Sequence, residues 1–134
     1  MTGLVLKLGP KERVLVNGVV VENGDRRTRV SILTPDANIL RLRDAIHPEE
    51  ANTPVRRVCY IMQLILSGDT QYEQARHQVM QGLVPLQSAF QDTTSHDILD
   101  GTRSLFEDQK IYPALKLLRQ LLPREEMMLQ RAAG

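Results

Sequence analysis

The sequence predicts an α+β protein, with a small antiparallel β segment first and a helical layer after it. Residues 4–43 hold short β-branched runs separated by turn residues, and from about residue 53 apolar residues recur at helical spacing. A chain of 134 residues is long enough for one domain or two small layers. We expect a β domain over 1–47 and a helical domain over 53–132. Because five short strands are too small to be stable alone, we expect the β domain to pack on the helices, on a second copy, or on both.

Short apolar runs and turn residues define the strands. Asn17-Gly18 between two valine-rich runs is a strong hairpin signal, because both positions of such a turn need a positive φ. Further turns are expected at Asn23-Gly24-Asp25 and within 34–38. The prediction is a tight antiparallel meander of five strands over residues 4–8, 13–16, 19–21, 27–33 and 39–43. In the last of them, Arg41 and Arg43 are expected on one face.

About four helices are predicted. The first begins after the N-cap Thr53, with Pro54 in its first turn, and ends at Gly68. Its apolar stripe comprises Val55, Val58, Cys59, Met62, Ile65 and Leu66. A second spans about 70–89, where Pro85 is expected to kink or end it. A third covers about 95–106, and a fourth starts near 113. Pro123 interrupts the fourth, and residues 124–132 are either its continuation or a frayed tail.

Composition excludes several classes of protein. The net charge is +1, there is one cysteine, and Trp is absent. A generally basic nucleic-acid coat, a disulfide framework and an aromatic platform for stacking bases are therefore not expected. The apolar runs are too short for a signal peptide or a membrane span, which predicts a cytoplasmic protein without membrane contact.

The charge is unevenly distributed. Residues 1–60 hold ten Lys and Arg against seven Asp and Glu, whereas 61–134 hold seven against nine. Arginines cluster in the β segment at 26, 27 and 29, then at 41 and 43. Arginine is suited to phosphate and base edges, so these side chains are a candidate RNA contact. The alternatives are a solvated sheet face, or arginines paired with the acidic helices of the same chain.

No catalytic constellation is apparent. His47, His77 and His96 lack metal-ligand spacing, and we expect each to be a surface or capping residue. Cys59 lies on an apolar stripe, which favours a core thiol over a nucleophile. There is no glycine-rich phosphate loop. The sequence therefore predicts no enzyme, cofactor, metal site or small-molecule substrate.

Nearly the full length resembles the FlbT family of flagellin-synthesis regulators. The segments that carry the likeness are Leu4-Val5-Leu6-Lys7-Leu8, Glu12-Arg13, Asn17-Gly18, Val21-Glu22-Asn23-Gly24, Ile39-Leu40-Arg41, residues 48–57 (Pro-Glu-Glu-Ala-Asn-Thr-Pro-Val-Arg-Arg) and Tyr112-Pro113-Ala114-Leu115-Lys116. The resemblance implies a post-transcriptional regulator that acts on the 5′ untranslated region of flagellin mRNA and alters its translation and stability. It also implies a partnership with a second small flagellar protein, FlaF. Both repression and activation occur in the family.

The β segment is also similar to the RNA-binding regulator CsrA, a five-stranded intertwined dimer. In that family the RNA surface pairs the first strand of one subunit with the last strand of the other. Arg43-Asp44-Ala45-Ile46 matches the last-strand pattern, and Glu12 and Gly18 match part of the early turn. The two consecutive arginines of the first CsrA strand are missing, since Lys7 is followed by Leu8. The similarity implies a homodimer as one alternative.

Two hypotheses of function follow, and an enzyme is a distant third. In the first, the protein contacts the flagellin mRNA leader and blocks ribosome access or recruits decay. The RNA-binding residues are then Arg41, Arg43, Lys7, Arg27 and Arg29. In the second, the helical half is a protein adaptor of flagellin synthesis and export that acts with FlaF, and effects on RNA are indirect. An apolar helical groove would be the docking device.

Overall fold

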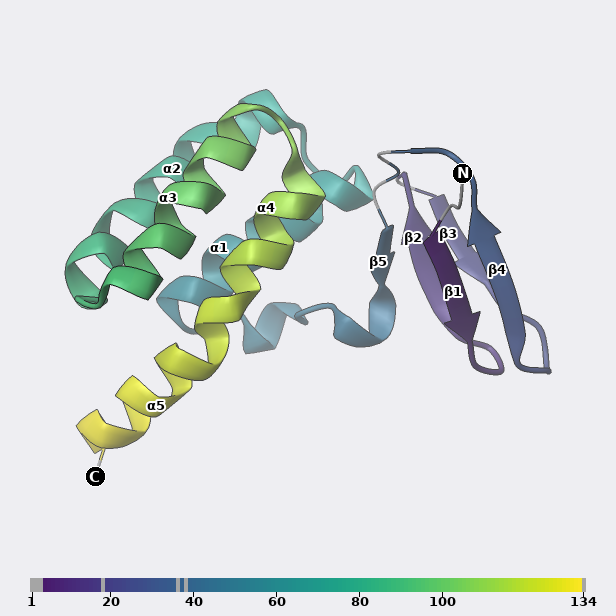
Figure 1. Ribbon diagram of the computed structural model, residues 1–134, viewed down its shortest axis with the longest axis horizontal. Coiled ribbons are helices and arrows are strands. Elements are labelled where there is room, and N and C mark those ends of the chain that lie inside the picture. The colour runs from purple at the N-terminus through teal and green to yellow at the C-terminus, as the bar shows by residue number, and fades with distance from the viewer. Residues whose placement is uncertain (1–3, 18, 36, 38, 134) are drawn as a thin grey trace. The chain divides into compact units, whose positions relative to one another are not determined.

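The computed structural model describes residues 4–17, 19–35, 37 and 39–133 (Figure 1). The chain forms two compact units, Met1–Ala45 and Ile46–Gly134. We call them the β unit and the helical unit. The α+β class is confirmed: among the described residues, the first unit has five antiparallel strands and the second has only helical elements.

The five strands form two sheets instead of a meander. They are β1 (Leu4–Leu8), β2 (Arg13–Val16), β3 (Val19–Glu22), β4 (Thr28–Ile32) and β5 (Ile39–Arg41). The β2–β3 hairpin forms at the predicted position, and Asn17 has a φ of 50°. Gly18, Asp36 and Asn38 of the predicted turns lie outside the described residues. The predicted meander is wrong because β1 pairs with β4, whereas β2 pairs with both β3 and β5.

A shared apolar core accounts for this pairing. Alternation directs Leu6 and Leu8 of β1 inward, where they cluster with Val14 of β2 and Ile39 of β5. Val30 and Ile32 of β4 are partly buried against the same cluster. Pairing β1 with β4 places Leu6 and Leu8 on the same side of their sheet as Val30 and Ile32, so the burial of apolar area against Val14 and Ile39 favours it over the pairing of sequence neighbours.

The last strand is shorter than predicted. It ends at Arg41, and a 3-10 helix covers Leu42–Asp44, closed by a hydrogen bond of 3.1 Å from the Ala45 N–H to the Leu42 carbonyl. Arg43 therefore follows the strand and does not alternate along it. The polar–apolar alternation of residues 39–43 is compatible with both structures, so the pattern alone could not separate them.

The helical unit contains α1 (Pro54–Ser67), α2 (Tyr72–Ala89), α3 (Thr93–Glu107), α4 (Ile111–Leu118) and α5 (Leu122–Ala133), after a 3-10 turn at Pro48–Glu50. A 3-10 turn at Arg119–Leu121 links the last two helices, so the predicted fourth helix is interrupted there and not at Pro123, which lies in the first turn of α5 (Figure 1). In α1, Thr53 accepts a hydrogen bond from the Arg56 N–H, and Gly68 ends the helix with a φ of 84°. Of the two effects predicted for Pro85, a kink or the end of the helix, the second does not occur: α2 continues to Ala89 with the proline on its exposed side.

Two glycines allow the helices to approach closely. A Cβ on Gly82 of α2 would lie 2.6 Å from a methyl group of Val58 in α1. A Cβ on Gly101 of α3 would lie 2.8 Å from a methyl group of Leu117 in α4. Both distances are shorter than a van der Waals contact, so a side chain at either position would force its neighbour to shift: the buried Val58 at Gly82, and the flexible end of Leu117 at Gly101. The low helix propensity of Gly101 is thus compensated by packing.

Candidate nucleic-acid interface

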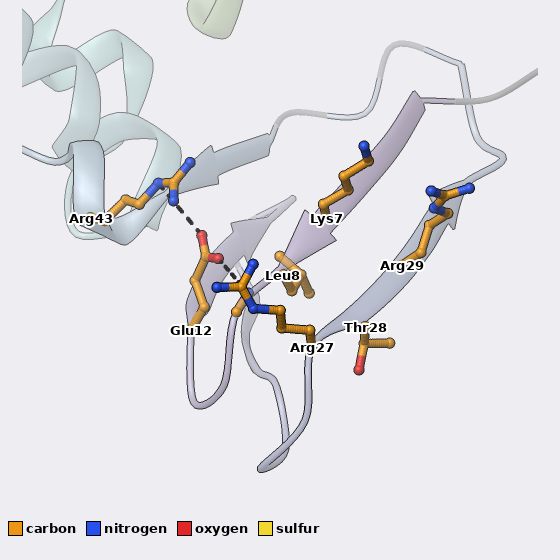
Figure 2. A pocket seen from close by; sticks show the side chains of 8 residues that line it. Lys7, Leu8, Glu12, Arg27, Thr28, Arg29 and Arg43 are labelled. Carbon is orange, nitrogen blue, oxygen red and sulfur yellow. Dashed lines mark hydrogen bonds and ion pairs between the residues drawn. The ribbon is translucent and has the colours of Figure 1, made fainter.

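A hollow of about 410 Å³ lies on the β unit (Figure 2). Strands β1 and β4, the loop after β1 and the 3-10 helix after β5 supply its lining. Four lining residues are cations and one is an acid. The lining comprises Lys7, Leu8, Gly9, Glu12, Arg27, Thr28, Arg29 and Arg43.

Lys7 and Arg29 are direct cross-strand partners. The β1–β4 register sets Lys7 opposite Arg29, and both side chains are exposed (Figure 2). Their inward neighbours Leu6 and Val30 form the next pair and belong to the core. The same alternation that buries the leucines and valine thus presents two positive charges together. Like charges directly opposite one another in a sheet are destabilising. The Lys7–Arg29 pair therefore lowers the stability of the sheet, and its two positive charges can bind an anion.

Arg27 and Arg43 extend the positive charge around the hollow. Arg27 immediately precedes β4, and Arg43 comes from the 3-10 helix. The Nε atom of Arg43 lies 3.8 Å from Oε2 of Glu12, which is a weak ion pair because the arginine side chain is 62% exposed. Within the described part of the chain, no carboxylate lies within ion-pair distance of Lys7, Arg27 or Arg29.

Glu12 links the loop after β1 to β5 through hydrogen bonds to its carboxylate. Arg41 donates to both of its carboxylate oxygens, from Nε to Oε2 at 2.7 Å and from Nη2 to Oε1 at 2.8 Å. The Gly9 N–H donates to Oε1 at 2.9 Å. The hydrogen bonds from Arg41, then that from Gly9, lower the pKa of Glu12 to about 2. The carboxylate is therefore ionised at neutral pH and holds the loop after β1 against β5.

Arg41 also donates to the backbone carbonyl of Lys7. Its side chain is largely buried, in contrast to that of Arg43. Arg41 thus ties together β5, the loop after β1 and the strand that carries Lys7. Of the five cationic residues predicted to bind RNA, Lys7, Arg27, Arg29 and Arg43 line the hollow, whereas Arg41 is hydrogen-bonded to Glu12 beside it.

Asn23 fixes the other rim of the hollow. Its Nδ2 donates to the carbonyls of Gly9 at 2.7 Å and of Arg26 at 2.9 Å. The backbone adds hydrogen bonds of 2.8 Å from the Lys11 N–H to the Gly24 carbonyl and from the Asn23 N–H to the Glu12 carbonyl. The loop before β2 is therefore held against the loop before β4, which positions Arg27.

Sequence reasoning missed Glu12 and Asn23 as parts of the site. It treated Asn23 as a turn residue, and both residues entered only the comparisons with the FlbT and CsrA families, with no role in the site. A signal was present, since an acid that lies among eight Lys and Arg in residues 1–45 is a natural partner for one of them. Which arginine binds Glu12 depends on the pairing of β2 with β5, which could not be predicted from the sequence.

The cysteine and the histidines considered as reactive residues occupy positions that suit a structural role. Cys59 is buried as predicted, and burial raises the pKa of its thiol to about 12, which removes its nucleophilic form at neutral pH. His47 caps the 3-10 turn at Pro48–Glu50, and the half-buried His96 ring nitrogen contacts the carbonyls of Gln87 and Phe90. Among the described residues, no group of three or more His, Cys, Asp or Glu could hold a metal ion. None of the described helices is long and apolar enough to cross a membrane.

These features define a class: an α+β protein in which a compact β unit presents a cationic hollow and a separate unit is helical. The comparison with known families identifies the family within this class. The family model described as flagellar protein FlbT matches residues 4–129. The chain belongs to this family.

Relatives of similar sequence carry the name of the same family. A "probable flagellum biosynthesis repressor protein FlbT" of Rhodopseudomonas palustris strain TIE-1 is 34% identical over 133 residues, which cover 96% of this chain and 98% of the relative. The protein of the same name from Chelativorans sp. strain BNC1 is 34% identical over 124 residues, 92% and 83% of the two chains. That of Mesorhizobium japonicum is 29% identical over 126 residues, 94% and 84%.

No solved structure matches this chain. The similarity of the β segment to CsrA therefore stays a prediction. Within this chain β1 pairs with β4 and β5 pairs with β2, so the first and last strands are not partners.

Proposed function

We propose that this protein regulates flagellum biosynthesis after transcription, by binding the 5′ untranslated region of flagellin mRNA through the hollow of the β unit. The observation that carries the proposal is the juxtaposition of Lys7 and Arg29 on the exposed side of β1 and β4, with Arg27 and Arg43 lining the same hollow. Family membership and the relatives' printed role in flagellum biosynthesis support the flagellar target. The place of action is the cytoplasm, where the mRNA is translated.

The chemistry of the hollow suits the RNA backbone. Four cations line one depression and can contact more than one phosphate, and arginine binds phosphate through two parallel N–H donors. The β unit has no Phe, Tyr or Trp in its sequence. Bases are therefore expected to stack on guanidinium planes, or not to stack at all. Affinity should come from charge and depend strongly on salt.

Regulation then follows from occlusion. A protein on the leader blocks ribosome access or recruits decay, and either result lowers flagellin synthesis. Repression is the direction printed in the names of the relatives. In this scheme Arg43, Lys7, Arg27 and Arg29 contact the RNA, and Arg41 acts through Glu12 by holding the loop and the strand in place.

The test is direct binding of the purified full chain to a labelled flagellin leader, beside a scrambled RNA of equal length and composition. We expect tighter binding to the leader, and at least about tenfold weaker binding for Arg29→Gln combined with Arg43→Gln. Lys11→Gln with Arg13→Gln is the matched control, because these cations lie outside the hollow lining and pair with Asp25 and Glu22. Equal affinity of the two double variants, or no preference for the leader, would contradict the proposal.

A second function, that of a protein adaptor acting with a FlaF-type flagellar protein, has its own supporting observation. The last helix, α5, exposes Met127, Met128 and Leu129, and Val84 of α2 is exposed as well. Methionine-rich surfaces adapt to protein partners. Binding of FlaF that is lost in Met127→Ser with Leu129→Ser, but kept in Arg29→Gln with Arg43→Gln, would favour the adaptor, and so would an affinity that hardly changes with salt.

A further inference from the structure

Strand β3 is apolar on both of its faces, and both faces are exposed. Val19, Val20 and Val21 are 61%, 56% and 43% exposed. Successive residues of a strand point to opposite sides, so these three valines cover both sides of β3. Runs of consecutive valines are typical of strands that are covered on both faces. In the single chain neither face is covered.

The outer edge of β3 is also open. The strand pairs with β2, and no described strand pairs with its other side. The other three strands at the margins of the two sheets have some protection: β1 carries the charge of Lys7, β4 carries that of Arg29, and β5 has only three residues. Charge and shortness are the devices by which proteins prevent edge pairing. Strand β3 is one residue longer than β5, and its single charged residue, Glu22, lies at its end, so its three consecutive valines carry no charge.

The β unit also has little core. Its apolar cluster has four buried side chains and four partly buried ones, and Leu15 and Leu40 are buried outside this cluster, in a unit of about 45 residues. Units of this size often need oligomerisation to be stable. Three adjacent exposed valines add no buried apolar area to the unit. Their burial in an assembly would add this area and so stabilise the unit.

We propose that β3 pairs with β3 of a second copy of this chain, antiparallel and about a two-fold axis at Val20. This register places Val20 opposite Val20 of the second copy and Val19 opposite its Val21, so that only valines meet. It also keeps the two Glu22 carboxylates at opposite ends of the ladder, each about 13 Å from the other along the strands. Glu22 further pairs with Arg13 of its own chain at 2.9 Å. The edge is therefore self-complementary in both shape and charge, which favours a second copy over a partner of different sequence.

The result joins two three-stranded sheets into one six-stranded sheet, with the order β5-β2-β3-β3-β2-β5. It does not depend on RNA binding. It also differs from the exchange of first and last strands implied by the similarity to CsrA, because β1 and β5 keep their partners within the chain.

The test is the mass of the full chain in solution, measured by sedimentation equilibrium over a range of concentrations. We expect the wild-type protein to dimerise, and Val20→Lys to weaken the dimer by at least about 100-fold, because two lysines would meet where two valines were buried. Val84→Lys is the matched control: Val84 is 61% exposed, lies on α2 and should leave the dimer unchanged. Circular dichroism of both variants checks that they fold.

Mixing provides the sharpest readout. Because Val20 faces itself, Val20→Lys and Val20→Glu should each be monomeric alone and should form a mixed dimer when combined, since opposite charges then meet. A monomeric wild-type chain would overturn the proposal. A dimer that Val20→Lys does not weaken would overturn it as well, since the contact would then lie elsewhere. Failure of the mixed dimer, with both single variants monomeric, would overturn the two-fold register at Val20.

Discussion

Lys7 and Arg29 face one another across β1 and β4, as a directly opposed pair of like charges on the exposed side of the sheet. On the same sheet, the residues that precede and follow Lys7 are buried leucines. Folding therefore brings the two cations together as a consequence of burying the core. Two cations in this arrangement repel one another until an anion binds between them.

This relationship predicts that Arg29→Thr stabilises the free β unit. Removing the repulsion should raise the free energy of opening of β1 and β4 by about 0.2–1 kcal/mol, and Thr is well suited to a strand. Amide hydrogen exchange in β1 and β4 measures it locally, without requiring both units to unfold together.

Arg13→Thr is the control for this experiment, with the opposite sign. Arg13 stands in register with Glu22 and forms an ion pair of 2.9 Å, so its loss should destabilise the β2–β3 hairpin slightly. If Arg29→Thr destabilised β1 and β4 instead, the cation pair would not be a source of repulsion.

The Glu12 carboxylate predicts how the β unit responds to acid. Its pKa is about 2 in the folded chain against an ordinary value of 4.5. Because the folded pKa is the lower one, the stabilisation is complete above pH 4.5 and is lost as the pH falls from 4.5 towards 2. Arg41→Gln should remove most of this pH dependence, since the Arg41 hydrogen bond is its largest cause.

Hydrogen exchange of the β-unit amides at pH about 5 and about 3 measures the effect. Glu22→Gln serves as the comparison, because its partner Arg13 also lowers the pKa of Glu22. Equal acid sensitivity of the wild-type protein and Glu12→Gln would contradict the assignment.

Much of this architecture could be predicted from sequence. The hairpin at Asn17, the N-cap at Thr53 and the helix end at Gly68 depend on local chemistry, and the structure confirms them. The partners of β1 and β5 could not be predicted, because pairing is decided by which side chains share a core far along the chain. The same holds for the site: features that depend on local sequence could be predicted, and those that depend on strand pairing could not. The cationic side chains were recognised, but the Glu12–Arg41 bridge spans 29 residues and depends on strand order.

Gly82→Ala should destabilise the helical unit, although alanine favours helix elsewhere. The new Cβ would lie 2.6 Å from a Val58 methyl group, so the α1–α2 crossing must open. The overpacking costs about 1–3 kcal/mol, against a gain of about 1 kcal/mol in helix propensity. Thermal unfolding of the variant and of exposed Gln81→Ala tests it. A melting temperature at or above that of the wild type would show that the helices have room to separate.

Glu125 should stabilise the start of α1 from a distance in sequence. It is buried, and its two oxygens accept hydrogen bonds from the Thr53 hydroxyl and from the Val55 N–H at 2.9 Å. Glu125→Ala leaves these donors without their acceptor, at a cost of about 1–3 kcal/mol. Exposed Glu126, which pairs with Arg56 at 3.3 Å, is the matched position, and Glu126→Ala should change stability by less than about 1 kcal/mol. Urea unfolding compares the two, and equal losses would contradict the role of Glu125.

The central claim is that the hollow binds the phosphates of RNA, and the salt dependence of binding tests it most directly. For four phosphate contacts to single-stranded RNA, the slope of log affinity against log salt should be about −2.8, a loss of about 50-fold between 50 and 200 mM. Lys7→Gln should bring the slope to about −2.1, whereas Lys11→Gln, outside the hollow lining, should leave it unchanged. A slope near zero for the wild-type chain, or the same slope for Lys7→Gln as for the wild type, would contradict the claim.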